Sequence, residues 1–270
     1  MANEQLTAEE IAKRVNEKFR NAPKGFGEAW SKKVFYGKPL TKKIGFVIAD
    51  NYEYDPFKKF AGEFKPTEFV AFGNNCIEFD FNEKIKVVAV ECGIGKVNAA
   101  LATMYLINEE KVDMILNVGL SGAIQNVKRN FIVAGTQYVE CDFDLTAIGY
   151  QLGVKPQDVY VYEADKNLIE KAKECSIDYF GKLGTGDIFL ADSGLKEKYK
   201  NTFDICSFDM ETGAIAAVCH KGNVPFLAIR KISDDCDENA VENYKELNDK
   251  KEVHLSEVAR EIIEKISESV

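Results

Sequence analysis

The sequence predicts an α/β fold: a three-layer α/β/α arrangement with helices on both faces of a central mixed β-sheet. Short apolar runs alternate with stretches of helical periodicity from Lys43 to the C-terminus, a pattern typical of α/β domains. The 270 residues are 46% hydrophobic and 29% charged, a composition that excludes wholesale disorder. No internal repeat or low-complexity linker divides the chain. We therefore expect a single domain over residues 41–270, preceded by a helical extension over residues 1–40.

The extension has its own helical pattern, which ends at a run of turn-forming residues. Thr7 and Glu10 have the spacing of a capping box, which marks the beginning of many helices. The run Ala22–Gly25 then breaks the pattern. Apolar residues recur at helical spacing between these signals: Leu6, Ile11, Val15 and Phe19. We expect this segment to form a helix that packs on the main domain or on a partner subunit.

The main domain is expected to contain seven buried strands and four longer helices. Gly, Asp and Asn residues bound the apolar runs, as they often bound strands. The expected strands are Ile44–Ile48, Val87–Val90, Met114–Val118, Gln137–Val139, Lys182–Leu183, Ile205–Phe208 and Phe226–Ile229. The expected helices are Val97–Asn108, Lys166–Cys175, Thr212–His220 and residues 253–266.

Charge and cysteine patterns exclude several classes of function. The chain has 44 acidic and 35 basic residues, a net charge of −9, so nothing attracts it to nucleic acid or to an anionic membrane. No apolar run approaches the roughly 20 residues of a membrane span, and the N-terminus lacks a signal-peptide core. Seven scattered cysteines without a C-x-x-C pair favour a reduced, cytoplasmic protein. The only two histidines are far apart, and we expect neither a metal nor a cofactor.

Residues suited to ligand binding follow four of the expected strands. Ligands of open α/β sheets bind at the carboxyl ends of strands. The relevant segments are Glu91–Lys96, Gly119–Ala123, Asp209–Gly213 and Ser233–Asp235. The first of them lacks the third glycine of a dinucleotide fingerprint and the Ser or Thr of a phosphate loop. No serine stands in a G-x-S-x-G motif with a partnered histidine, so a serine nucleophile is not expected.

Glu53, Glu211 and Asp234 lie far apart in the sequence, yet each follows an expected strand. Carboxylates without histidine or metal suit acid–base cleavage of a glycosidic bond. One acid protonates the leaving group, while another orients water and stabilises positive charge on the sugar carbon. The residues by themselves leave a second interpretation open, in which Asp234 and Asp235 cap a loop and Glu53 is a surface acid.

Seven segments occur together in the order typical of one enzyme family. They are Lys43–Ala49, Cys92–Thr103, Asn117–Ala123, Asp144–Tyr150, Thr185–Leu190, Asp209–Ile215 and Val218–Asp234. The M-E-x-x-A and R-x-I-S-D elements within them, at their mutual spacing, are the most specific. On these segments the chain resembles the 5′-methylthioadenosine/S-adenosylhomocysteine nucleosidases of the purine nucleoside phosphorylase superfamily. The resemblance implies a nucleoside phosphorylase-like fold and hydrolysis of the N-glycosidic bond of an adenine nucleoside.

The resemblance also implies catalytic roles for individual residues. Asp234 would be the general acid that protonates purine N7, and Ser233 would orient it. Glu53 would activate the water that attacks C1′. Glu211 would accept hydrogen bonds from the ribose 2′- and 3′-hydroxyls.

Further residues would contact the substrate without taking part in proton transfer. Met210 would lie against the sugar, with Arg230 nearby. Phe189 would stack on the base, the backbone of Leu190 would bind the adenine edge, and Tyr244 would cover the ribose.

The family resemblance implies a homodimer, because a neighbouring subunit contributes to the 5′-alkylthio pocket in this family. Here Ile148 and Pro156 would supply that contribution. Two departures concern the pocket itself: Asp209 replaces the first glutamate of an E-M-E element, and Leu120 stands where a small residue is expected.

Other functions stay open at this point. A purine nucleoside phosphorylase would have to hold phosphate, which usually requires arginines, and only five of the 35 basic residues are arginine. Adenosine and aminofutalosine hydrolases would share the same catalytic carboxylates. A non-catalytic nucleoside-binding protein is a further alternative.

Overall fold

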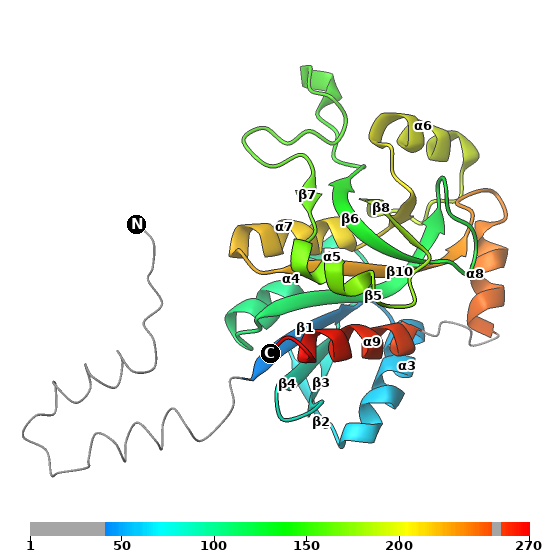
Figure 1. The fold of residues 1–270 in the computed structure, drawn as a ribbon. Coiled ribbons are helices and arrows are strands. Elements are labelled where there is room, and N and C mark those ends of the chain that lie inside the picture. The colour runs from blue at the N-terminus through cyan, green and yellow to red at the C-terminus, as the bar shows by residue number, and fades with distance from the viewer. Residues whose placement is uncertain (1–40, 250–254) are drawn as a thin grey trace, which may run out of the picture. The chain divides into compact units, whose positions relative to one another are not determined.

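The computed structural model describes residues 41–249 and 255–270, and the helix expected within residues 1–40 lies outside this part of the chain. Residues Lys42–Val270 form one compact unit, built on a ten-stranded sheet (Figure 1). The strands are β1 Lys42–Ile48, β2 Thr67–Ala71, β3 Asn74–Asp80, β4 Ile85–Glu91, β5 Met114–Ala123, β6 Ile132–Glu140, β7 Tyr162–Glu163, β8 Tyr179–Thr185, β9 Ser207–Asp209 and β10 Phe226–Asp234.

The sheet is mixed, as predicted, and part of it closes on itself. Nine of the strands follow the order β10-β6-β8-β9-β5-β1-β4-β3-β2, and the tenth, β7, pairs with β6. An additional pairing joins β10 to β5. The strands β5, β10, β6, β8 and β9 therefore form a closed ring, while β1, β4, β3 and β2 extend from it as an open wing. Strands β1, β4, β5 and β10 are parallel to one another, and β9 runs antiparallel to β5. This ring was not predicted from the sequence.

Helices cover both faces of the sheet. On one face α4 and α7 pack against each other and reach β1 and β6; on the other, α9 packs against α3, α5 and β5. The helices are α3 Asn51–Ala61, α4 Lys96–Asn108, α5 Lys166–Ala172, α6 Ser193–Phe203, α7 Thr212–Gly222, α8 Ala240–Asp249 and α9 Leu255–Ser267, with 3₁₀ turns η1 Gly62–Phe64 and η2 Thr146–Ile148. None of these helices is long and apolar enough to cross a membrane.

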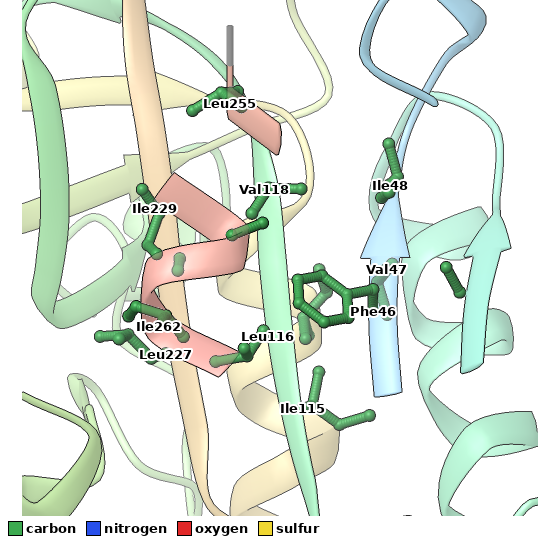
Figure 2. Packing of buried hydrophobic residues seen from close by; sticks show 14 of the residues in the cluster. Phe46, Val47, Ile48, Ile115, Leu116, Val118, Leu227, Ile229, Leu255 and Ile262 are labelled. Carbon is green, nitrogen blue, oxygen red and sulfur yellow. The ribbon is translucent and has the colours of Figure 1, made fainter. Parts of the chain in front are cut away.

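One part of the hydrophobic core lies between the sheet and α9. Figure 2 shows Ile262 of α9 beside Leu116 of β5 and Leu227 of β10, and all three side chains are fully buried. The helix expected over residues 253–266 corresponds to α9, although its first residues lie outside the described part. A core of this kind holds β5 and β10 rigidly side by side, and the ends of these two strands carry the site described next.

Candidate active site

A single cavity gathers most of the residues that the sequence singles out. It contains about 580 Å³ of empty space, part of it open to solvent, at the carboxyl ends of β1, β5 and β10. We call it the carboxylate cavity. Of the expected site residues it is lined by Glu53, Phe189, Leu190, Met210, Glu211, Ser233, Asp234 and Tyr244.

Glu53 lies in a helix that the sequence analysis did not predict. The Asp50 side chain caps α3 by accepting a hydrogen bond from the Glu53 backbone N–H at 3.2 Å. The Glu53 carboxyl group then turns inward and accepts hydrogen bonds from the N–H groups of Leu120 (2.6 Å) and Ala49 (3.2 Å). Burial, and next the charge of Asp50, raise the pKa of Glu53 to about 8. This carboxyl group therefore keeps its proton to a higher pH than an exposed glutamate does.

Arg230 is fully buried in the middle of β10. Its Nε lies 3.2 Å from Asp209 Oδ2, and its Nη2 donates to Asn117 Oδ1 and Thr212 Oγ1, each at 2.6 Å. Glu211 Oε2 lies 3.6 Å from the same Nη2. The guanidinium group is thus fully partnered behind the cavity wall. The resemblance places Arg230 near the sugar, but this residue does not line the cavity.

Gly119 of β5 makes room for this charged cluster. A Cβ atom at this position would lie 2.1 Å from Arg230 Nη1 and 2.8 Å from Glu53 Oε1. No side chain is therefore compatible with both groups in their observed positions. The segment Gly119–Ala123, expected to follow a strand, is instead the end of β5 itself.

Asp209 organises the turn that carries Met210 and Glu211. Its Oδ1 accepts hydrogen bonds from the backbone N–H groups of Glu211 (3.0 Å) and Thr212 (2.9 Å) and from Thr185 Oγ1 (3.0 Å). Strand β9 is antiparallel to β5, but Gly122 pairs with Phe208, so the following residues run back along β5 towards the cavity. The segment that follows the carboxyl end of β9 therefore reaches the same cavity as the ends of β1, β5 and β10, although β9 is antiparallel to β5.

Glu211 is held at the beginning of α7 with its carboxyl group buried. Its Oε1 accepts a hydrogen bond from the Gly95 backbone N–H at 3.0 Å. Burial raises the pKa of Glu211 to about 7, and the nearby Arg230 opposes this rise. The contacts with Gly95 and Arg230 fix the orientation of the Glu211 carboxyl group, so its oxygen atoms are already positioned to accept hydrogen bonds from a ligand.

Asp234 lies at the end of β10 and is only 4% exposed. Its Oδ2 is 2.7 Å from Ser233 Oγ, which also lies 3.3 Å from the Ser121 carbonyl oxygen, and its Oδ1 accepts from the Cys236 N–H at 2.9 Å. Burial raises the pKa of Asp234, against the hydrogen bonds of Ser233 and Cys236. A carboxylic acid that keeps its proton longer than usual is suited to act as a general acid.

Aromatic and apolar residues form the remaining wall. The Phe189 and Tyr244 rings meet edge to face, with centroids 5.6 Å apart at an interplanar angle of 75°. The Tyr244 hydroxyl donates to Asp50 Oδ2 at 3.2 Å. Leu190 is buried, whereas Phe189 is 43% exposed. Phe189 therefore keeps part of its side chain exposed at the cavity.

Ile148 and Pro156 are not part of this cavity. Ile148 is 69% exposed in η2, and Pro156 is also exposed. Sequence reasoning did not assign roles to Asn117, Thr212 and Cys236. A buried asparagine in an apolar strand is a signal that could have identified the first of them, because such a side chain needs a partner.

The charged residues that line the cavity are acidic. The carboxylate cavity is lined by Asp50, Glu53, Asp209, Glu211 and Asp234, and among the residues that the structure describes no lysine or arginine lines it. Within residues 41–249 and 255–270, no group of three or more His, Cys, Asp or Glu side chains is arranged to hold a metal ion. The arrangement is suited to a ligand that develops positive charge.

Comparison with known proteins agrees with this geometry. Residues 43–264 match the model of the phosphorylase superfamily. The 5′-methylthioadenosine/S-adenosylhomocysteine nucleosidase of Buchnera aphidicola is 32% identical over 83% of this chain and 97% of that protein. The futalosine hydrolase of Helicobacter pylori has a TM-score of 0.79 at 26% identity, over 83% of this chain and 98% of its own.

A second Helicobacter pylori structure, a 5′-methylthioadenosine/S-adenosylhomocysteine nucleosidase in complex with a substituted pyrrolidin-3-ol, has a TM-score of 0.78. It is 28% identical, over 85% of this chain and all of that one. The chain therefore belongs to the phosphorylase superfamily and, within it, to the 5′-methylthioadenosine/S-adenosylhomocysteine nucleosidase family.

Proposed function

We propose that this protein hydrolyses the N-glycosidic bond of an adenine nucleoside, 5′-methylthioadenosine or S-adenosylhomocysteine, and releases adenine and the ribosyl product. The observation that carries the proposal is a cavity lined by five acidic residues and no basic residue. Cleavage of this bond places positive charge on the sugar carbon, and nearby carboxylates stabilise that charge.

Asp234 is proposed to protonate the departing base at N7. Its raised pKa keeps a proton available, and the Ser233 hydroxyl at 2.7 Å fixes the direction of the carboxyl group. Phe189 provides the ring on which the base stacks, and the Leu190 backbone would bind the adenine edge. Because adenine would be bound by backbone atoms, its recognition needs no distinctive side chain.

Glu53 is proposed to activate the attacking water, and Glu211 to bind the ribose hydroxyls, with Met210 against the sugar. Arg230 acts through Glu211, whose carboxyl group it holds at 3.6 Å, and not by touching substrate. Positive charge on the sugar would draw Glu53 towards its ionised form, since an opposite charge nearby lowers the pKa of a carboxyl group.

Phosphorolysis is the main alternative, and the cavity argues against it. A phosphate dianion needs cationic partners, yet the lining contains none and the buried Arg230 already has partners. The structural likeness to a futalosine hydrolase favours a related nucleosidase as the second candidate.

Product release from a panel of 5′-thio- and 5′-hydroxy-nucleosides, measured with and without phosphate, tests the reaction and its alternatives. Adenine release should be equally fast with and without phosphate, and the sugar product should carry a free reducing end, because water is the nucleophile. Chromatography of the products would check this. Strict phosphate dependence would establish a phosphorylase instead, and no release from any purine nucleoside would favour a binding protein.

Asp234→Asn should lower kcat/KM about 10²- to 10⁴-fold, because the amide cannot donate a proton to the base. The neighbouring variant Asp235→Asn serves as control and should change activity less than about threefold. Steady-state kinetics, with circular dichroism to confirm folding, measures both. Full activity in Asp234→Asn contradicts the assigned general acid.

The raised pKa of Glu53 makes folding stability depend on pH. The folded pKa, about 8, exceeds the unfolded value of 4.5. The resulting stabilisation is fully present below pH 4.5 and is lost as the pH rises towards 8. Glu53→Gln should therefore lose less unfolding free energy than wild type between pH 5 and 8, by on the order of 1 kcal/mol or more. Urea unfolding measures this, and Glu264→Gln, at an exposed position of α9, should behave like wild type.

A homodimer is proposed on the exposed apolar face of α4. Val97, Leu101 and Met104 are 79%, 46% and 49% exposed, and exposed Ile148 could reach a partner's site only across such an interface. Leu101→Glu should convert the dimer to monomers and weaken substrate binding, as light scattering and KM would show. A wild-type monomer with full activity contradicts this arrangement.

The seven free cysteines suit a reducing compartment, and we propose the cytoplasm as the location.

A further inference from the structure

Helix α4 begins without a cap from its own side chains. The residue before it is Gly95, which offers no side-chain cap, yet the first backbone N–H groups of a helix need acceptors. Two carboxyl groups from remote segments supply them. Glu211 Oε1 accepts from the Gly95 N–H at 3.0 Å, and Asp187 Oδ1 accepts from the Lys96 N–H at 2.8 Å. The positive end of the helix dipole favours carboxylates at this position.

The two acceptors belong to segments that are proposed to hold different parts of the nucleoside. Glu211 is proposed to bind the ribose. Asp187 belongs to the segment Gly186–Leu190 between β8 and α6, which we call the base loop because it carries Phe189. The beginning of α4 therefore joins the ribose-binding segment to the base-binding one.

The side chain of Lys96 holds the base loop a second time. Its Nζ donates to Asp142 Oδ1 at 2.6 Å, and Asp142 Oδ2 accepts from the Asp187 backbone N–H at 2.8 Å. Lys96, Asp142 and Asp187 thus form a closed ring of hydrogen bonds, which we call the latch. The latch holds Asp187 through its backbone and its side chain, two residues before Phe189.

The latch depends on the positive charge of Lys96. The side chain is 18% exposed, and Glu140 Oε2 lies 3.3 Å from its Nζ. Burial lowers the pKa of Lys96, but the hydrogen bond and charge of Asp142 outweigh burial, and the pKa is raised. Without this ammonium group, two like charges would be left close together. Lys155 would still pair with Glu140, whereas Asp142 would lose the cation that fixes it.

We propose that Lys96 and Asp187 are positioning residues, which fix the base loop so that the Phe189 ring meets the base. Neither of the two lines the carboxylate cavity, so both act through the loop and not by touching substrate. A loop that is ordered in advance binds its ligand more tightly than one that must be ordered on binding. The inference rests on the proposed function, which places the base at Phe189.

Adenine affinity tests the latch, because adenine is the part of the substrate that the base loop would hold. Titration calorimetry of the full-length protein with adenine measures it without turnover. Lys96→Met should raise the Kd about five- to tenfold, as loss of one aromatic contact would. Asp187→Ala should do the same, whereas Asp187→Asn keeps an acceptor oxygen and should stay within about twofold of wild type. Asp187 is exposed, so this pair of variants decides if Lys96→Met does not fold.

A double-mutant cycle shows whether the latch acts through the aromatic ring. Phe189→Ala alone should raise the Kd about five- to tenfold. Combined with Lys96→Met, the total loss should be clearly smaller than the product of the two single losses, because the latch no longer has a ring to position. Circular dichroism of each variant confirms folding.

Lys155 provides a matched control. Its side chain is 19% exposed and pairs with the same Glu140. Within the described part of the chain, no hydrogen bond joins Lys155 to the base loop. Lys155→Met should therefore leave the adenine Kd within about twofold of wild type.

An adenine Kd in Lys96→Met within about twofold of wild type overturns the inference, as does an equal loss in Lys155→Met. Single losses that multiply fully in the double variant overturn it as well. If the wild type binds adenine but releases none from any nucleoside, the proposed function fails and the latch is still judged on adenine affinity. A wild type that does not bind adenine overturns both.

Discussion

The buried guanidinium group of Arg230 is the constraint on which the rest of the site depends. A buried cation is tolerated only when charged and polar partners surround it. Asp209, Asn117, Thr212 and Glu211 supply these partners here. Removing one of them would leave a buried charge uncompensated, which typically costs several kcal/mol. The turn after β9, the beginning of α7 and the centre of β10 are thereby held in fixed positions.

That arrangement also determines the state of the carboxyl groups in front of it. Arg230 is already shared between Asp209 and Glu211, so its charge does not overcome the desolvation of Glu53. The pKa values of Glu53 and Glu211 are accordingly raised to about 8 and about 7. Positive charge in the cavity would stabilise the ionised form of these two carboxyl groups. The transition state of glycosidic cleavage supplies such a charge, whereas a phosphate ion would add a negative one.

The fold serves this site by bringing together chain segments that are far apart in sequence. Asp50 and Glu53 come from the beginning of α3, Glu211 from that of α7 and Asp234 from the end of β10. The closed ring of strands explains how an antiparallel strand, β9, takes part in a site otherwise built at parallel strand ends. Tyr244 of α8 donates a hydrogen bond to Asp50, which caps the beginning of α3, so this bond connects α8 to the cavity wall.

The sequence alone predicted the fold class, and it named residues that the structure brings together in one cavity. Apolar runs such as Phe226–Ile229 form strands that are buried on both faces, and such a run can be recognised without knowing which strands lie beside it. Eight of the expected site residues line one cavity. The largely exposed strand β2, its partner β3 and the helices α3, α6 and α8 were not predicted, and the helical pattern of α3 is interrupted by Pro56. Only the tertiary structure could place Arg230 behind the cavity, require a glycine at position 119 and raise the pKa of Glu53. These properties depend on distances and burial between residues remote in the chain, and no local pattern encodes them.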